Sequence, residues 1–488
     1  MSTDVLPRLA ARFRATLGAD AVVDDEAELR TYECDGLTHY RVSPGLVVLP
    51  GSPDEVAGVV RACADAGVPF VARGSGTGLS AGALPRADGV LIVTSRMRTI
   101  LEVNTLDERA VVEPGVINLD VTRAAAPDGY YYAPDPSSQQ VCSIGGNVAE
   151  NSGGAHCLKY GFTTHHVTGL DVVTPDGDLV SLGGRAPDSP GYDLVGAFVG
   201  SEGTLGIATR VTVRLMRAPE CVRTLLAGFR TTDDAGAAVS AIIAEGVVPA
   251  AIEMMDALSI EAAEFAVKCG YPEGAGGVLV VELDGPEAEV EHQFAAVQRL
   301  CEANAAFEIR VAADDAERAL IWKGRKSAFA AVGRISPDYI VQDGVIPRTA
   351  LPEVLHAISE LETRTGVRVA NVFHAGDGNL HPLVLYDESV PGEADRAEEA
   401  SGAILDLCIE HGGSITGEHG VGADKAKHMP RMFTDEDLDT MQLLRCAFDP
   451  DGLSNPGKVF PTPRLCGEVP GRHRGVHPLA ESGVAEVF

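Results

Sequence analysis

The feature that most constrains this chain is a set of three glycine-rich segments, at residues 73–82, 142–154 and 200–207 of 488. The first segment lacks the G-x-G-x-x-G spacing of a Rossmann loop and the G-K-[ST] ending of a P-loop. Backbone N–H groups in a glycine turn can still form a concave nest for a diphosphate, because no Cβ blocks the approach. A single loop of this kind is often a plain structural turn. Three of them together predict a long polar ligand threaded through one domain.

The charge balance limits the partners of the chain. Lys and Arg total 39 and Asp and Glu total 70, which gives a formal net charge of −31. Nucleic acids and anionic lipid head groups are recognised by clustered cations, so neither is an expected partner. The N-terminus lacks the order of a signal peptide, and no stretch of about 18 apolar residues exists to span a membrane. We therefore expect a cytoplasmic protein without direct membrane insertion.

Alternating strand and helix patterns predict an α+β fold. Residues 46–50, 54–66 and 68–72 form a predicted βαβ unit, and residues 134–161 are predicted as loop. A second pattern follows residue 220, with strands at 223–229, 278–283 and 307–312 and helices at 233–245, 287–303 and 315–332. We expect it to form an antiparallel sheet with helices on one face. The predicted domains are residues 1–220, residues 221–440, and a C-terminal segment 441–488 that returns to the first domain.

A group of histidines indicates a metal site. Asp377-Gly378 lies between two strand-like runs and predicts a two-residue hairpin turn. That turn would place His374 opposite His381, with Cβ atoms about 4.5–5.5 Å apart. Glu418 offers a third ligand, and two His with one carboxylate suit Zn²⁺, Mn²⁺ or Fe²⁺. Hydrogen-bonded turn histidines are the alternative, but the combination of the pair with Glu418 favours a metal.

The three glycine-rich segments, together with residues 32–37 and 133–161, resemble those of the vanillyl-alcohol oxidase family of FAD-linked oxidases. Within that family, they are most similar to the FAD-binding large subunits of bacterial glycolate oxidase (glycolate dehydrogenase). The resemblance covers most of the chain. It implies a two-lobed FAD-binding domain and an α+β cap domain, with an antiparallel sheet, over the isoalloxazine ring. The first glycine loop contains neither His nor Cys for attachment, so FAD is expected to bind non-covalently. The residues expected to contact FAD are Arg73, Gly74, Ser75, Gly76, Thr77, Gly78, Ser80, Pro134, Asp135, Ser138, Gly145, Gly146, Asn147, Asn151, Gly153, Gly154, Tyr160, Gly161, Glu202, Gly203, Ile207 and Asn455.

The resemblance also implies catalytic roles. Relatives that act on D-2-hydroxy acids bind a divalent metal at the two His and the Glu and use the following His, here His419, as the base. Arg325 is expected to bind the substrate carboxylate, because a guanidinium pairs with carboxylate through two parallel hydrogen bonds. A solvated helix charge is the alternative for this arginine. Relatives that take larger diacids carry a Lys near position 341, where this chain has Val341-Gln342, and this difference favours a small monocarboxylate.

The predicted activity is FAD-dependent oxidation of a small 2-hydroxy acid, with metal-assisted proton abstraction and hydride transfer to flavin N5. Glycolate, giving glyoxylate, is the leading substrate, and D-lactate or another D-2-hydroxy acid is the alternative. A metal-dependent hydrolase and a flavin-bearing scaffold without turnover are alternatives of other classes. The ten cysteines contain no C-x-x-C pair for an iron–sulfur cluster, so electrons must leave through a partner. The resemblance implies a second flavin subunit and an iron–sulfur subunit, which would also account for attachment at the inner membrane.

Overall fold

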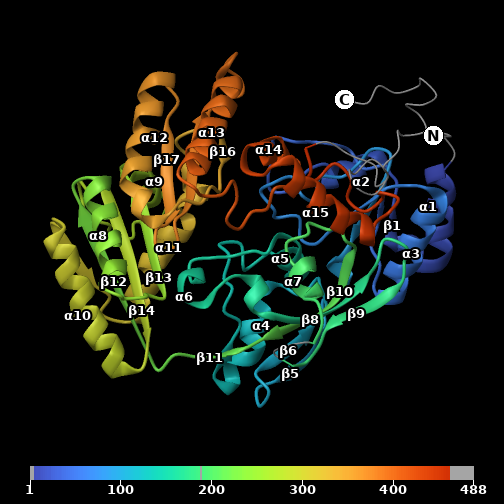
Figure 1. The fold of residues 1–488 in the computed structure, drawn as a ribbon, viewed down its shortest axis with the longest axis horizontal. Coiled ribbons are helices and arrows are strands. Elements are labelled where there is room, and N and C mark those ends of the chain that lie inside the picture. The colour runs from blue at the N-terminus through green and yellow to red at the C-terminus, as the bar shows by residue number, and fades with distance from the viewer. Residues whose placement is uncertain (1–4, 187–189, 462–488) are drawn as a thin grey trace.

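The computed structural model describes residues 5–186 and 190–461, and these residues form two parts that lie side by side (Figure 1). The N-terminal part contains three sheets and the cap contains one larger sheet. We use "cap" for the part from β12 to α13. The α+β class and the antiparallel cap sheet expected from the sequence are both confirmed.

The first lobe of the N-terminal part is a small mixed sheet of order β1-β2-β4-β3. Its central strands are parallel and almost fully buried, as their Val- and Ile-rich runs indicate. The helix between β2 and β3 begins after Ser52, whose hydroxyl accepts from the Glu55 N–H, and ends at Gly67 in the left-handed conformation. The elements of this lobe are α1 (Val5–Leu17), β1 (Val22–Val23), α2 (Glu26–Leu29), β2 (Leu46–Val48), α3 (Pro53–Ala66), β3 (Phe70–Arg73) and β4 (Val90–Val93).

The second lobe is a five-stranded antiparallel sheet of order β5-β6-β10-β8-β9. Residues 134–161, predicted as loop, contain two short helices, α5 and α6. Strands β7 and β11 form a separate two-stranded ladder. The elements are β5 (Ile100–Asn104), β6 (Arg109–Val112), α4 (Asn118–Ala125), β7 (Tyr130–Tyr131), α5 (Ile144–Glu150), α6 (Cys157–Tyr160), β8 (Val167–Val173), β9 (Leu179–Gly183), α7 (Leu194–Phe198), β10 (Ile207–Arg214) and β11 (Met216–Arg217).

The cap is built on a seven-stranded antiparallel sheet of order β15-β12-β14-β13-β17-β18-β16. Its central strands are buried along their whole length, including β13, a strand that was not predicted from the sequence. The strands are β12 (Cys221–Phe229), β13 (Ala251–Asp256), β14 (Gly277–Gly285), β15 (Glu308–Val311), β16 (Asp338–Val341), β17 (Val369–His374) and β18 (Asn379–Tyr386).

Helices cover both faces of the cap sheet, so the prediction of helices on one face was wrong. One core joins the sheet to α8, α10, α12 and α13, and a second core joins the opposite face to α9 and α11. Complete burial of the central strands is the consequence of this double cover. The helices are α8 (Thr232–Ala244), α9 (Ala257–Val267), α10 (Glu287–Ala303), α11 (Asp315–Val332), α12 (Leu351–Thr365) and α13 (Glu393–Glu410).

After the cap, the chain returns to the N-terminal part, where α14 (Met429–Met432) and α15 (Asp435–Phe448) lie (Figure 1). The return begins before residue 441, since the N–H groups of residues 423 and 424 donate to the Ser80 carbonyl. Further along, Ser454 bridges to Phe70 of β3. Residues 462–488 of the predicted C-terminal segment lie outside the described residues. Over the described ranges, no helix combines the length and the apolar character that crossing a membrane requires.

Candidate active site

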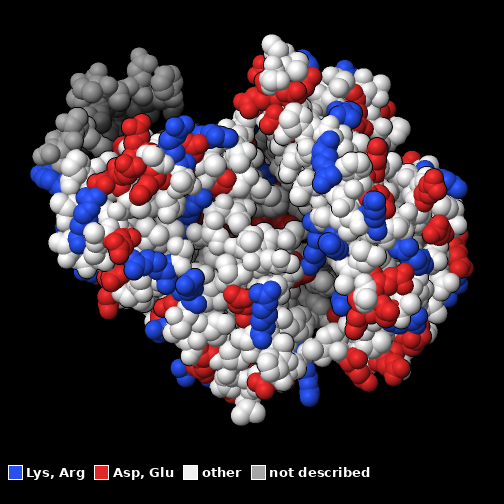
Figure 2. All heavy atoms as spheres, turned by 180° about the vertical axis from the view of Figure 1, so that it is seen from behind, with Lys and Arg blue, Asp and Glu red and all other residues white. Residues whose placement is uncertain are grey.

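One cavity of about 620 Å³ joins the glycine-rich loops to the cap. The back view shows a hollow between the two parts of the molecule (Figure 2). The cavity extends from the first glycine loop to Glu418 and His419, and Lys326, Phe329 and Tyr339 of the cap complete its wall. Thirteen of the residues expected to contact FAD line it: Arg73, Gly74, Ser75, Gly76, Thr77, Gly78, Ser138, Gly145, Gly146, Asn147, Glu202, Gly203 and Ile207.

The loop that follows β3 has the close approach for which glycine is needed. A Cβ on Gly74 would lie 2.2 Å from the Ser143 hydroxyl oxygen, at the start of α5. Gly76 has a φ of +70°, and a Cβ there would meet the Arg73 guanidinium. The loop runs directly into the strand β4, so it is neither a Rossmann nor a P-loop turn.

The other residues expected at FAD lie away from the cavity wall and make contacts that shape the loops instead. Asn455 donates to the carbonyls of Gly82 and Glu202, and Tyr160 donates to Asp284 of the cap. A Cβ on Gly153 would lie 2.8 Å from Glu418 Oε2, so this glycine leaves room for Glu418. The residues expected to contact FAD but absent from the cavity wall are Ser80, Pro134, Asp135, Asn151, Gly153, Gly154, Tyr160, Gly161 and Asn455.

The histidine hairpin forms, but with a register that differs from the prediction. His374 pairs with Asn379, and His381 pairs with Val372. The connection is therefore longer than a two-residue turn, and Gly378 donates to the His374 carbonyl within it. His374 and His381 are diagonal neighbours rather than directly opposed. Because a shift of two positions keeps both side chains on one face, their ring centroids still lie 4.9 Å apart.

The structure brings the three predicted metal ligands together. His374 Nε2 lies 3.2 Å and His381 Nε2 lies 3.0 Å from the same atom, Glu418 Oε1. Donor atoms bound about 2.1 Å from one cation lie about 3.0–3.4 Å apart, so this spacing fits a shared ion. All three side chains are nearly or fully buried, at 5%, 1% and 10% exposure. The residues present therefore suit a divalent cation, although the site remains a prediction.

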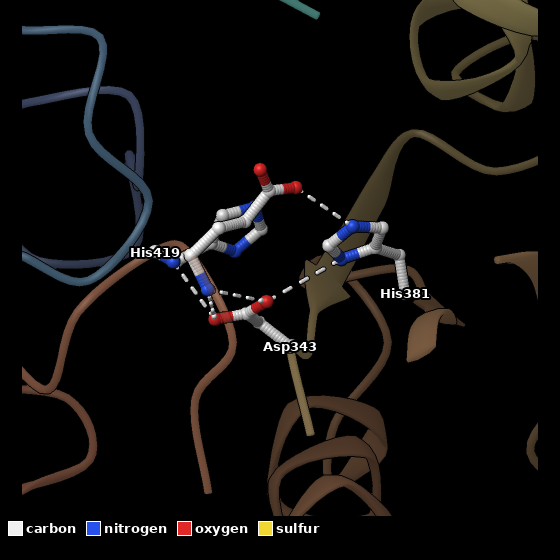
Figure 3. A group of neighbouring side chains, drawn as sticks. Asp343, His381 and His419 are labelled. Atoms are coloured by element: carbon white, nitrogen blue, oxygen red, sulfur yellow. Dashed lines mark hydrogen bonds and ion pairs between the residues drawn. The ribbon is translucent and has the colours of Figure 1, made fainter. Parts of the chain in front are cut away.

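A fourth residue, the acidic Asp343, lies beside this group (Figure 3). Asp343, His381, Glu418 and His419 each place a possible ligand atom within 4.8 Å of the others. The Asp343 Oδ2 atom, however, accepts from the backbone N–H groups of residues 417–419, at 3.0, 3.1 and 2.8 Å. Lys425 Nζ lies 3.4 Å away. Burial acts to raise the pKa of Asp343, but neighbouring His419 and Lys425 hold it below its ordinary value. We interpret Asp343 as the anchor of this backbone rather than as a ligand.

His419, predicted to be the base, lies at the end of the cavity near the candidate metal ligands. It lines the cavity, its ring stacks on His381 with centroids 5.0 Å apart, and its buried Nδ1 has no hydrogen-bond partner among the described residues. Burial lowers the pKa of His419 to about 4, although Asp343 opposes this effect. The imidazole is therefore neutral near pH 7.

Arg325 lies behind the cavity wall rather than on it. It is 1% exposed, and its Nη2 lies 2.5 Å from Glu253 Oε2. The Nη2–Glu253 contact is an ion pair, and by hydrogen-bond geometry neither Nε nor Nη2 has a partner in residues 5–186 and 190–461. Lys326, the next residue on α11, does line the cavity and lies 3.7 Å from Asp135. The carboxylate-binding role of Arg325 thus remains a prediction.

The loop of residues 416–422, which carries Glu418 and His419, is held from both parts of the molecule. Asp343 of the cap accepts hydrogen bonds from the backbone N–H groups of residues 417–419. Glu202 of the N-terminal part accepts hydrogen bonds from the N–H groups of Val421 and Gly422, both at 2.6 Å. Glu202 was expected at the cofactor; it lines the cavity, and it also positions this loop.

Three residues of the site were not singled out in the sequence: Glu253, Asp343 and Lys326. Glu253 is buried in β13 between apolar neighbours, and a lone charge inside an apolar run is the signal that marks it. Asp343 follows the buried end of β16 in the same way. Lys326 gives no comparable signal, because charges are common on helix surfaces.

Comparisons with known proteins agree with these observations. Residues 44–183 match the FAD binding domain family, and residues 218–459 match the family of FAD linked oxidases, C-terminal domain. Similar proteins include the glycolate oxidase subunit GlcD of Escherichia coli, 52% identical over 93% of this chain and 91% of that protein. The subunit of the same name from Bacillus subtilis is 39% identical over 91% of this chain and 94% of its own length. A D-lactate dehydrogenase of Anaerostipes hadrus is 30% identical over 93% of this chain and 98% of its own length.

Solved structures show the same fold at low sequence identity. The 4-ethylphenol oxidase of Gulosibacter chungangensis superposes with a TM-score of 0.80 at 20% identity, covering 95% of this chain and 98% of that one. A p-cresol methylhydroxylase gives a TM-score of 0.79 at 17% identity, covering 94% and 97%. The two-lobed FAD-binding fold of the vanillyl-alcohol oxidase type is thereby confirmed. The chain belongs to the FAD-linked oxidases and is an FAD-dependent oxidoreductase.

Proposed function

We propose that this protein oxidises glycolate to glyoxylate. The observation that carries the proposal is the single cavity that runs from the glycine-rich loops to Glu418 and His419. An FAD bound along the loops would therefore share one continuous cavity with the acid–base group. Oxidation of a 2-hydroxy acid removes one proton from the hydroxyl group and one hydride from Cα. Bound FAD supplies the hydride acceptor for this reaction.

Residues of the chain would bind the metal ion, accept the proton and bind the substrate carboxylate. His374, His381 and Glu418 would hold a divalent cation, Zn²⁺, Mn²⁺ or Fe²⁺, which supplies polarisation of the hydroxyl oxygen. His419 accepts the hydroxyl proton, since its side chain lines the cavity and its Nδ1 has no hydrogen-bond partner in the described part of the chain. Arg325 would bind the substrate carboxylate; its guanidinium lies buried behind the wall, next to the wall residue Lys326, and keeps donors that Glu253 does not take up. A metal-dependent hydrolase would use the same His and Glu residues but would leave the long cavity along the glycine loops without a purpose.

Glycolate is favoured over D-lactate by the comparisons. The relatives named for glycolate oxidase are 52% and 39% identical, and the relative named for D-lactate is 30% identical. D-lactate remains the second candidate, because that relative spans nearly the whole chain. The aromatic and apolar side chains of Phe329, Tyr339 and Val341 on the cavity wall suit a small substrate, and Lys326, the cation beside them, is already paired with Asp135 at 3.7 Å.

Anaerobic stopped-flow measurement of flavin reduction tests the proposal. The purified protein, reconstituted with FAD and supplied with Mn²⁺, is mixed with glycolate, D-lactate or L-lactate, and the flavin absorbance is followed near 450 nm. We expect the fastest reduction with glycolate, slower reduction with D-lactate and none with L-lactate. A His419→Asn variant should bind FAD normally and reduce it at least 100-fold more slowly, as expected for loss of a general base. Reduction by D-lactate with the larger kcat/KM would overturn the choice of glycolate.

The electrons are proposed to leave through partner subunits. Relatives from two bacteria are named as subunits of glycolate oxidase, and this chain lacks a C-x-x-C cluster motif. We infer that a second flavin subunit and an iron–sulfur subunit complete the enzyme and bring it to the inner membrane from the cytoplasm. Purification of the tagged chain from its own cells, followed by iron and flavin analysis of the complex, tests this inference. Absence of iron and of a second flavin chain would contradict it.

A further inference from the structure

A buried carboxylate, Glu253, lies at the centre of the cap sheet beside the candidate metal site. It belongs to β13, whose residues are all buried, and it is directly opposite His374 of β17. Paired residues on neighbouring antiparallel strands point to the same face, so both side chains lie on the face covered by α9 and α11. Glu253 is 1% exposed, and an ionised group is retained there only when charged or hydrogen-bonded partners compensate its desolvation.

The partners of Glu253 are two residues with predicted roles in the reaction. Its carboxylate oxygens accept from His374 Nδ1 at 2.8 and 2.9 Å. Its Oε2 also lies 2.5 Å from Arg325 Nη2. Burial acts to raise the pKa of Glu253, but Arg325 and His374 lower it overall, which fits a charged carboxylate.

We propose that Glu253 is a positioning residue that aligns the metal-binding His374 and the carboxylate-binding Arg325 with one side chain. The proposal rests on the function proposed above and adds a residue to it. By accepting from Nδ1–H, Glu253 fixes the tautomer of His374 and leaves its Nε2 aimed at Glu418, where the ion would bind. Through its ion pair with Nη2, it holds the Arg325 guanidinium beside the same carboxylate.

The shared carboxylate links two parts of substrate recognition. A 2-hydroxy acid must place its hydroxyl group near the ion and its carboxylate near Arg325 at the same time. Because one rigid strand holds the common partner of both groups, the distance between them is set by the sheet and not by flexible loops. Loss of Glu253 should therefore weaken both metal binding and substrate binding, and not only the stability of the fold.

The neighbouring strand offers a matched control. Glu282 on β14 is also 1% exposed, belongs to the same sheet face, and is paired with Arg318, at 2.7 and 2.8 Å, and with His156. It touches neither His374 nor Arg325 in the contacts of the described residues. Glu282→Gln thus removes an equally buried charge, one that has more partners than Glu253, without touching the residues that Glu253 positions.

The experiment compares wild-type, Glu253→Gln and Glu282→Gln proteins, each loaded with FAD. Mn²⁺ alone is titrated into the metal-free proteins and free Mn²⁺ is counted by electron paramagnetic resonance. We expect the Mn²⁺ Kd of Glu253→Gln to rise about 10–100-fold, the range found when a partner of a ligating histidine is removed. We also expect its KM for glycolate to rise at least 10-fold while FAD content is unchanged. Both constants of Glu282→Gln should stay within about twofold of wild type, even if its melting temperature falls.

Glu253→Asp is the second variant, because it keeps the charge and withdraws the carboxylate by one methylene. It should show the same two changes to a smaller extent, and it answers the question if Glu253→Gln does not fold. Mn²⁺ and glycolate constants of both variants that match those of Glu282→Gln would overturn the positioning role. If wild-type flavin is not reduced by any 2-hydroxy acid, the proposed function is wrong. The Mn²⁺ titration would still test whether Glu253 positions His374 for metal binding.

Discussion

Replacing His156 with Gln should destabilise the junction between the two parts of the protein in a pH-dependent way. His156 belongs to the N-terminal part, and its Nδ1 lies 2.9 Å from Asp135 Oδ2. Its Nε2 lies 3.2 Å from Glu282 Oε1 of the cap, where Arg318 and the Trp322 indole also meet that carboxylate. Burial acts to lower the pKa of His156, but the two carboxylates raise it to about 10. The side chain is therefore an imidazolium at neutral pH.

The size of the effect follows from proton linkage. Between the ordinary value of 6.5 and about 10, the folded protein holds a proton on His156 that the unfolded chain does not. The contribution to the free energy of unfolding is complete below pH 6.5 and falls by about 1.4 kcal/mol per pH unit as the pH rises toward 10. The full shift corresponds to about 5 kcal/mol. Since the side chain is 20% exposed, solvent screening should leave about 2–3 kcal/mol.

The assay is the melting temperature of the FAD-loaded protein from pH 6 to pH 10. At pH 6, His156→Gln should melt at least about 5 °C below wild type. A loss of 1 kcal/mol lowers the melting temperature of a domain of roughly 150–250 residues by about 2–4 °C. The gap should close as the pH approaches 10. His356→Gln is the control, since His356 makes a similar contact of 3.4 Å to Glu360 but both side chains are about 70% exposed. A gap for His156→Gln that is the same at pH 6 and pH 10 would refute the reasoning.

Two glycine substitutions test the loops of the site. Gly378→Ala should lower the melting temperature and the Mn²⁺ affinity, because its φ is +83° and a Cβ would lie 2.1 Å from the Ile346 carbonyl oxygen. Gly366→Ala, at a φ of +71° in open space, should cost only about 1 kcal/mol; equal losses for the two variants would contradict the steric argument. Gly74→Val should raise the Kd for FAD at least 10-fold in a flavin fluorescence titration, because its Cβ would meet the Ser143 hydroxyl at 2.2 Å. An unchanged Kd would show that the close approach of these loops is not needed for the cofactor.

Regular amphipathic helices were the most predictable elements. The bounds predicted for α10 and α11 are those observed, because each helix shows a clear periodic apolar face bounded by acidic residues at its start. Of the two helices on the second face of the cap sheet, α11 was predicted but α9 was not. Strand β13 and helix α9 are short and rich in Ala and Met, so their apolar runs fit a strand or a helix equally well.

The candidate metal ligands were recognised because His374, His381 and Glu418 lie in short, distinctive glycine-rich runs. Their pairing was predicted with the wrong register, since an Asp-Gly pair does not by itself reveal that the turn is longer than two residues. Glu253 and Asp343 were not predicted as site residues, because their roles depend on the residues that they contact from other parts of the chain. That information belongs to tertiary structure, as each contacts residues more than 70 positions away.

The loop of residues 416–422, held by Asp343 on one side and Glu202 on the other, limits how this enzyme can be rebuilt. A chimera that joined this N-terminal part to the cap of a relative would need a matching loop and both carboxylates together. Exchange of the cap alone would remove Asp343, and the N–H groups of residues 417–419 would lose their acceptor unless the new cap supplied a carboxylate in the same place. The two parts of the chain are therefore not independent modules, and new substrate preferences are better sought by changing single residues of the cavity wall than by exchanging whole domains.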